Sequence, residues 1–246
     1  MELQPYVIKK ELIQIFKQVN TVFVENEFGI TMCPAISAVY KVAGRYIKSE
    51  LNYDFIAKSF NRAFFLLNFL KNLVCLDIAL DCGFTFDADI LDIGCGSAPA
   101  SIAAHKLSLA RGLNRHHFTL IDKSQRQIQM AHTFCDAIGI DVKSYLIEPF
   151  HFRDVIYNGT AIFSYFVCEQ DKDFINKLYQ QHKQFNHGFV VVDYDNIVNH
   201  IVNAFSFKED CRIQPISVSV TLPDEIANSL HRDEVTVYGC IYTKKE

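Results

Sequence analysis

The sequence predicts an α/β protein in which a layer of helices precedes a mostly parallel sheet. From residue 87 onward, short apolar runs alternate with helix-forming segments, which is typical of a parallel sheet covered by helices. Before that point, apolar residues recur at helical spacing. The last two strand-like runs are separated by only 11 residues, so we expect them to pair antiparallel.

Residues 1–84 are expected to form a helical lid. Apolar side chains recur every three or four residues in two stretches of it, Ile8, Leu12, Ile15, Phe16, Val19 and Phe23 in the first and Ile56, Phe60, Phe64, Leu67, Leu70 and Val74 in the second. A shorter helix is expected over 34–49, and Gly83 ends the layer. Polar residues interrupt the most hydrophobic stretch, 63–80, so we interpret it as a core helix and expect no membrane span.

Residues 85–246 are expected to form a second domain with seven strands. The strands are expected at 89–93, 117–122, 142–147, 161–166, 189–193, 213–222 and 234–243. Helices are expected over 97–111, 124–138 and 171–185, followed by a short one that ends near residue 203. Pro215 weakens the sixth strand because it cannot donate a ladder hydrogen bond.

Composition limits the class of protein. The chain has 246 residues, half of them hydrophobic, which is enough for a sizeable core. No charged leader with an apolar stretch and cleavage site is visible, and the eight cysteines form no CxxC pair. We therefore expect a cytoplasmic protein with free thiols and no metal site. The net charge of −4 argues weakly against nucleic acid as the main partner.

The glycine-containing stretch ILDIGCGSAPASIAA, residues 90–104, indicates a nucleotide-like cofactor. Gly94 and Gly96 remove side chains where a strand turns into a helix, so a ligand can approach the backbone amides there. Asp92 sets a carboxylate beside that turn. A dinucleotide fingerprint would need a third glycine where this chain has Pro99, so the match to that pattern is incomplete.

The pattern acidic-x-Gly-x-Gly with Ala98 two residues further on resembles the class I (Rossmann-like) S-adenosylmethionine-dependent methyltransferases. The resemblance implies a Rossmann-like sheet of seven strands with a C-terminal antiparallel strand. It also implies that the loop holds the amino-acid part of S-adenosylmethionine. The loop residues assigned to the cofactor are Asp92, Gly94, Cys95, Gly96 and Ser97.

The end of the second strand offers a second cofactor contact. Asp122 ends the run FTLID, and a carboxylate there can accept hydrogen bonds from both ribose hydroxyls. The resemblance assigns that role to Asp122, with Lys123 beside it, and Ser124 is a plausible N-cap of the next helix. NAD also carries an adenosine ribose, so Asp122 does not separate the two cofactors.

The third strand is followed by the segment EPFH. By position in the family, Glu148 would meet the adenine amino group, and Phe150 would pack on the ring next to Pro149. His151 lies at the same edge and is a candidate general base, although a loop histidine is more often solvent-facing.

The segment SYFVCEQ after the fourth predicted strand indicates the acceptor side. It is similar to a Ser-Tyr-apolar-apolar-x-Glu segment of methyltransferase-like proteins associated with the mitochondrial small ribosomal subunit, and it lacks the Asn-Pro-Pro-aromatic signature of amino-methylating enzymes. Ser164 is assigned to the cofactor. Tyr165, Glu169 and Asp193 are candidate catalytic residues because substrates enter at the carboxyl ends of parallel strands.

These observations favour a methyltransferase that moves a methyl group to an O or N acceptor, with a small molecule as the preferred substrate. RNA stays an alternative partner, because similar helical extensions precede some ribosomal RNA methyltransferases. A non-catalytic cofactor-binding module and an NAD-linked oxidoreductase are further alternatives. The oligomeric state is not predicted.

Overall fold

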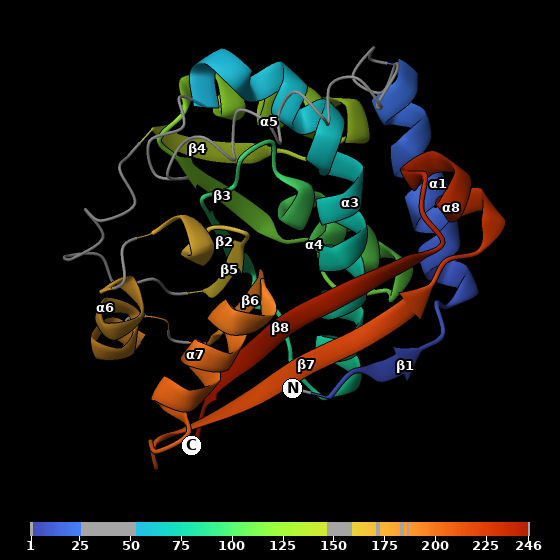
Figure 1. The fold of residues 1–246 in the computed structure, drawn as a ribbon. Helices are drawn as coiled ribbons and strands as arrows, with labels where there is room; N and C mark the ends of the chain where they lie inside the picture. The colour runs from blue at the N-terminus through green and yellow to red at the C-terminus, as the bar shows by residue number, and fades with distance from the viewer. Residues whose placement is uncertain are drawn as a thin grey trace.

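The computed structural model describes residues 2–25, 53–146, 159–170, 173–182, 185 and 187–245. Within these residues the chain forms a sheet of eight strands in the order β1-β7-β8-β6-β5-β2-β3-β4, with helices on both sides (Figure 1). Strand β8 runs antiparallel to β6 and β7, and every other neighbouring pair is parallel. The prediction of a mostly parallel sheet with an antiparallel C-terminal strand is confirmed.

The seven predicted strands are all present, with small changes at their ends. They are β2 (Asp89–Ile93), β3 (His117–Asp122), β4 (Val142–Leu146), β5 (Thr160–Ser164), β6 (Phe189–Asp193), β7 (Cys211–Thr221) and β8 (Glu234–Lys244). Pro215 lies inside β7 opposite Cys240 of β8. On its other side, β7 is paired with β1 only at residues 218–220, so Pro215 lies where that side of β7 is an edge among the described residues, a position at which a strand tolerates proline.

The eighth strand, β1 (Gln4–Tyr6), was missed by the prediction, which treated residues 1–84 as wholly helical. It is three residues long and adds to the edge of β7 in parallel. A strand of this length has too few residues for a period-2 pattern, so only the exposed edge of β7 reveals it.

Helices connect the strands. They are α1 (Lys10–Glu25), α3 (Tyr53–Asp81), α4 (Pro99–Ala110), α5 (Gln125–Ile138), α6 (Phe174–Gln181), α7 (Asp195–Phe205) and α8 (Asp224–Leu230), with a 3₁₀ turn, η3 (Val167–Glu169). The helix expected over 34–49 lies outside the described residues. Helix α8 has only seven residues, which is why β7 and β8 are antiparallel neighbours rather than parallel strands joined by a crossover.

Two hydrophobic cores lie on opposite faces of the sheet. In β6, Val190 and Val192 pack into the core formed with α1, α3, α4 and α5, whereas Phe189 and Val191 pack into the core formed with α6 and α7. This alternation is the period of two expected for a strand buried on both faces. The helices of the N-terminal part therefore share one core with the strands and helices of the sheet.

Helix α3 runs along the sheet over much of its height (Figure 1). Residues 60–81 are long and apolar enough to cross a membrane, but 72% of the apolar window is buried inside the protein. The prediction of a core-packed helix is confirmed. Near its end, the buried Asp77 accepts a hydrogen bond from Tyr6 and pairs with Lys9 and Arg111, which ties β1, α1 and α4 together.

Candidate functional site

The glycine loop between β2 and α4 turns sharply back onto β3. The backbone amides of Gly94 and Cys95 both donate to the Ile121 carbonyl, at 2.8 and 3.0 Å. Gly94, Gly96 and Ala98 all have positive φ angles, 68°, 54° and 65°. Glycine adopts this region without steric cost, so the two glycines allow the turn that the sequence predicts.

Asp122 joins the glycine loop to the end of β3. Its Oδ2 accepts a hydrogen bond from the Gly96 amide, and its Oδ1 accepts one from the Ser124 amide, both at 2.8 Å. Burial raises the pKa of this carboxyl group above its ordinary value. The Ser124 hydroxyl accepts from the Gln127 amide and caps α5, as the sequence predicts. The two predicted cofactor contacts, the loop and Asp122, therefore lie side by side.

Asp92 lies beneath the loop and is completely buried. Its Oδ2 accepts hydrogen bonds from the Ser101 hydroxyl at 2.7 Å and the Ser101 amide at 3.1 Å, in the first turn of α4. The N-cap residue Ala98 has no side-chain oxygen, so Asp92 caps α4 from the strand instead. Burial raises the pKa of Asp92 to about 7. Asp92 therefore supports the start of α4 beneath the loop, and its contact with the cofactor stays a prediction.

This burial predicts a pH effect on stability. The pKa of Asp92 is about 7 in the folded protein, whereas its ordinary value, which applies to the unfolded chain, is 3.8. Between these two pH values the folded chain binds more protons than the unfolded chain does. The free energy of unfolding therefore falls as the pH rises through this range. The Asp92→Asn variant lacks this titrating group. From pH 5 to pH 8, its free energy of unfolding should therefore rise by about 2 kcal/mol relative to that of wild type. Urea unfolding at both pH values measures this. Asp141→Asn, at an exposed position, is the control, and equal pH profiles for all three proteins would contradict the prediction.

A buried polar network ties the loop to α3 and α5. The Ser97 hydroxyl donates to Asn61 Oδ1 at 2.6 Å, and Asn61 Nδ2 donates to Gln127 Oε1 at 2.9 Å. All three side chains are buried. Asn61 therefore bridges the glycine loop after β2 and the helix that follows Asp122 and Lys123. Of the remaining predicted loop residues, Cys95 is buried and Lys123 is exposed.

Replacing Asn61 should loosen the loop. Asn61→Leu removes the hydrogen bonds to Ser97 and Gln127 and leaves the Ser97 hydroxyl and the Gln127 amide group without them, which costs about 2 kcal/mol. Hydrogen exchange of the Ser97 and Ala98 amides should accelerate in this variant. Asn68→Leu is the matched control, because that side chain makes no hydrogen bond within the described residues. Unchanged exchange at the loop in Asn61→Leu would show that Asn61 does not position it.

The carboxyl ends of β5 and β6 form the predicted acceptor side. The Ser164 hydroxyl accepts a hydrogen bond from Asn72 of α3 at 2.7 Å. Asp193 is buried, and its two oxygens accept from the Cys168 and Tyr194 amides at 3.0 and 2.8 Å. Its carboxylate thus holds η3 against β6. Glu169 is partly buried in η3, on the same edge.

Tyr165 has an unusual backbone for a large residue, with a φ of 53°. Its amide donates to the Val192 carbonyl, and its ring meets the edge of the Tyr194 ring at a centroid distance of 5.5 Å. Burial and the nearby Asp193 carboxylate raise the pKa of its hydroxyl group well above the ordinary value, so Tyr165 is protonated at neutral pH. Strained residues of this kind are concentrated at functional sites.

Four predicted site residues, Glu148, Pro149, Phe150 and His151, lie outside the described residues. Within the residues that are described, no group of three or more His, Cys, Asp or Glu side chains could hold a metal ion, and the seven cysteines there are free thiols.

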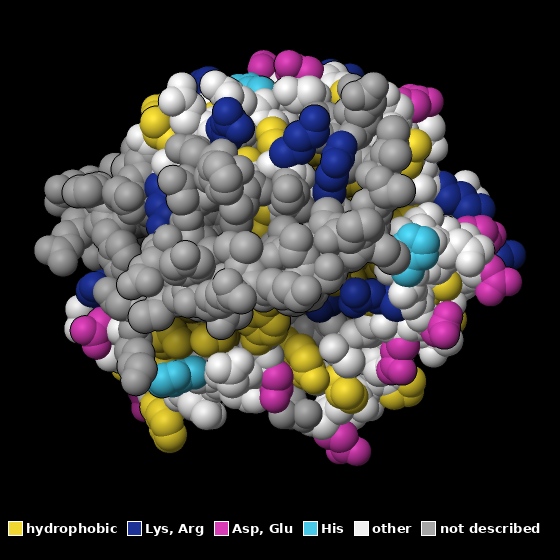
Figure 2. Space-filling view, turned by 45° about the horizontal axis from the view of Figure 1, so that its top comes forward, with side chains coloured by type: hydrophobic (Ala, Val, Ile, Leu, Met, Phe, Trp, Pro, Cys, Tyr) yellow, Lys and Arg dark blue, Asp and Glu magenta, His cyan; other side chains and the backbone are white. Residues whose placement is uncertain are grey.

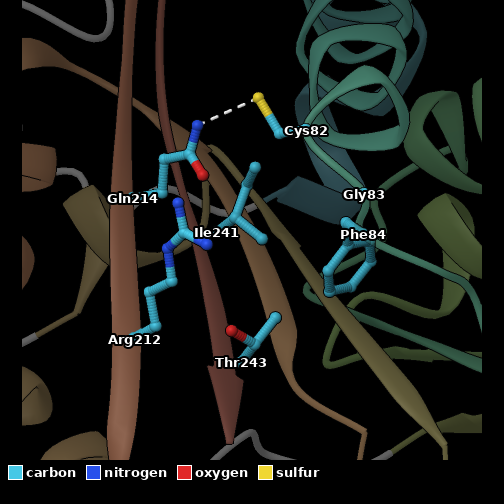
Figure 3. A pocket seen from close by; sticks show the side chains of 7 residues that line it. All are labelled: Cys82, Gly83, Phe84, Arg212, Gln214, Ile241 and Thr243. Carbon is cyan, nitrogen blue, oxygen red and sulfur yellow. Dashed lines mark hydrogen bonds between the residues drawn. The ribbon is translucent and has the colours of Figure 1, made fainter. Parts of the chain in front are cut away.

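A cavity of about 90 Å³ lies at the other edge of the sheet, where β7 begins and β8 ends (Figure 3). Arg212 and Gln214 of β7 line it next to their ladder partners Thr243 and Ile241 of β8, together with Cys82, Gly83 and Phe84. Gln214 donates a hydrogen bond to the Cys82 thiol at 2.9 Å. This cavity is too small for a nucleotide-like cofactor and lies away from the glycine loop.

Comparison with solved structures identifies the fold. Precorrin-6y C5,15-methyltransferase from Geobacter metallireducens GS-15 aligns over 71% of this chain and 86% of its own, with 13% identity and a TM-score of 0.50. An rRNA methylase from Escherichia coli aligns over 94% and 92%, with 12% identity and a TM-score of 0.49. The plantazolicin methyltransferase BamL, in complex with a triazolic desmethylPZN analog and SAH, aligns over 96% and 97%, with 10% identity and a TM-score of 0.46.

No family model and no curated protein matches the sequence. The fold is that of the class I S-adenosylmethionine-dependent methyltransferases, as the glycine-loop resemblance implies.

Sequence reasoning missed three residues around the site: Asn61, Lys71 and Phe166. Phe166 packs so closely on Gly94 that a Cβ there would lie 2.1 Å from its ring. Asn61, Asn68 and Asn72 fall on one face of α3, since seven and eleven residues are close to two and three helical turns. A polar stripe on an otherwise apolar helix was the available signal, and it was used only to exclude a membrane span.

Proposed function

We propose that the protein is an S-adenosylmethionine-dependent methyltransferase. One arrangement carries the proposal: the glycine loop after β2 is bonded to Asp122 at the end of β3, in a sheet whose last strand is reversed. A nicotinamide-binding domain is expected to keep its strands parallel, so the reversed β8 favours the methyl donor over NAD.

The residues present fit this cofactor. A Cβ on Gly96 would meet nothing within 4 Å, so the loop has open space beside it, and the Asp122 carboxylate lies directly below. In the proposal, the loop from Gly94 to Ser97 receives the amino-acid part, and Asp122 accepts hydrogen bonds from the ribose hydroxyls. Lys123, Glu148, Pro149, Phe150 and Ser164 complete the proposed cofactor site. When bound, the sulfonium supplies an electrophilic methyl group.

We propose that the chain contributes mainly by orienting the acceptor and excluding water, which can supply several kcal/mol of barrier reduction. A base is needed only if the acceptor must lose a proton, and Glu169, Tyr165, His151 and Asp193 are the candidates. Asp193 is the weakest, because it is buried and both of its oxygens accept backbone hydrogen bonds. Tyr165 serves better as a contact for the acceptor than as a base, since its hydroxyl group holds its proton.

Residues 1–84 are proposed to act as the lid of this site. The contact that supports this role is the bond of Asn61 in α3 to Ser97 in the glycine loop. A lid that touches the cofactor loop would order it when the cofactor binds. A small or medium-sized molecule is the proposed acceptor, and the transferred methyl group goes to an oxygen or nitrogen atom.

Calorimetry with S-adenosylmethionine, S-adenosylhomocysteine and NAD tests the cofactor. We expect binding of the first two and none of NAD, and stabilisation by NAD alone would overturn the proposal. Methyl transfer to a panel of small molecules, read out as S-adenosylhomocysteine formation, tests turnover. Cofactor binding without turnover on any acceptor would favour the non-catalytic module. An RNA titration with a steep salt dependence would favour the ribosomal alternative.

A further inference from the structure

Lys71 of α3 lies at the acceptor side of the proposed site. Its Nζ is 5.4 Å from the centroid of the Tyr165 ring, within the range of a cation–π contact. The Tyr165 ring in turn meets Tyr194, which is 47% exposed and opens this group of residues to solvent. Lys71 itself is partly buried, and neither the catalytic nor the cofactor assignment uses it.

The positive charge of Lys71 has no carboxylate partner among the described residues. Lys71 forms no ion pair there, although Lys9, Lys17 and Arg111 all do. The nearby Asp193 is buried and accepts backbone hydrogen bonds at both oxygens. An ammonium that is removed from water without a paired charge destabilises the fold, so a bound anion would be favourable at this position.

A second positive charge acts on Lys71. Burial and then the exposed guanidinium of Arg232, which lies between α8 and β8, lower the pKa of Lys71 to about 8. At neutral pH the side chain is still mostly protonated. The other titratable groups at this edge, Asp193, Tyr194, Cys168 and Cys75, act on Tyr165. Lys71 and the rings of Tyr165 and Tyr194 therefore form one group of side chains at the acceptor side.

We propose that Lys71 binds an anionic group, a carboxylate or a phosphate, of a small aromatic methyl acceptor that packs against Tyr165 and Tyr194. This inference rests on the proposed methyltransferase function, because it assigns the substrate class of that site. Figure 2, in which the top of Figure 1 comes forward, shows both Lys or Arg and Asp or Glu side chains beside hydrophobic ones among the residues drawn in colour.

Benzoate, phenyl phosphate and the neutral isostere benzamide are the probes, titrated by calorimetry with and without S-adenosylhomocysteine. We expect benzoate or phenyl phosphate to bind wild type at least ten times more tightly than benzamide. Lys71→Met should lose this preference, and Lys71→Arg should keep it. Met retains the apolar stem of lysine, so the fold should survive, and the thermal unfolding of each variant checks this. Lys143→Met, at an exposed position of β4, is the matched control.

Equal binding of benzoate and benzamide, or a preference that persists in Lys71→Met, would overturn the proposal. Binding of single-stranded RNA that depends on Lys71, without binding of either small anion, would overturn it in favour of a polyanion. The titration with S-adenosylhomocysteine separates the two levels of inference. If that ligand does not bind, the methyltransferase proposal fails, while the anion preference of the unliganded protein still decides the role of Lys71.

Discussion

Replacing Gly94 by alanine should lower the free energy of unfolding by about 3 kcal/mol. Two causes add at this position. The φ angle of 68° is unfavourable for a residue with a Cβ, and that Cβ would lie 2.1 Å from the Phe166 ring. Phe166 is buried between Phe163 and Phe174, so it cannot move away without disturbing the core on that face. Urea unfolding of the purified variant measures the loss.

Gly96 provides the control for this prediction. Its φ angle is 54°, but a Cβ there would meet nothing within 4 Å, so only the backbone cost of about 1 kcal/mol applies. The same substitution should nevertheless weaken binding of S-adenosylmethionine, because the open space beside Gly96 is where we propose that the cofactor lies. Equal unfolding free energies for the two variants would show that Phe166 does not constrain the loop.

Replacing Asp122 by alanine should weaken binding of S-adenosylmethionine roughly 10- to 100-fold. The estimate assumes the loss of one or two hydrogen bonds to a charged group, each worth about 1.5–3 kcal/mol, partly offset because the ionised carboxylate is costly to bury. The variant also leaves the Gly96 and Ser124 amides without their acceptor, so the loop itself should be less stable. Isothermal titration calorimetry measures the affinity, and unfolding measures the stability separately.

Asp141→Ala makes the same change of charge at an exposed position and should leave the affinity unchanged. An Asp122→Ala variant that binds S-adenosylmethionine as tightly as wild type would remove Asp122 from the cofactor site. If Asp122→Ala loses both its affinity and its fold, the Asp122→Asn variant separates the two effects. It keeps one acceptor oxygen for a backbone amide, so it should retain more stability than affinity.

Much of the fold was predictable because the segments that form strands by their local sequence are also the segments that the folded sheet buries. In β2, Leu91 and Ile93 pack on one face and Ile90 on the other, so the apolar run that predicts a strand is also the run that the sheet buries. The short link before β8 limited the last two strands to an antiparallel pair. Strand β1 was missed because three residues carry no periodic signal, and its pairing depends on an edge that only the folded sheet offers.

The candidate site was predictable only in part, for a similar reason. Gly94, Gly96 and Asp122 follow a pattern in the chain, and the structure brings them together because neighbouring parallel strands end at the same edge. The carboxylates Asp92 and Asp193 look alike in sequence as polar residues at strand ends, yet both are buried and cap backbone amides. Asp122 also accepts two backbone amides but is only partly buried. How far a strand-end carboxylate is exposed to a ligand depends on packing, which its position in the sequence does not reveal.

The amino-acid sequence by itself determined the order of strands and helices, the glycine turn and the carboxylate at the end of the second parallel strand, because each depends on residues close together in the chain. Only the tertiary structure decided what covers that turn. Asn61 and Phe166 contact the glycine loop, and Lys71 contacts Tyr165, all from segments far from that loop in sequence. Contacts between distant segments are set by the shared core, not by local pattern.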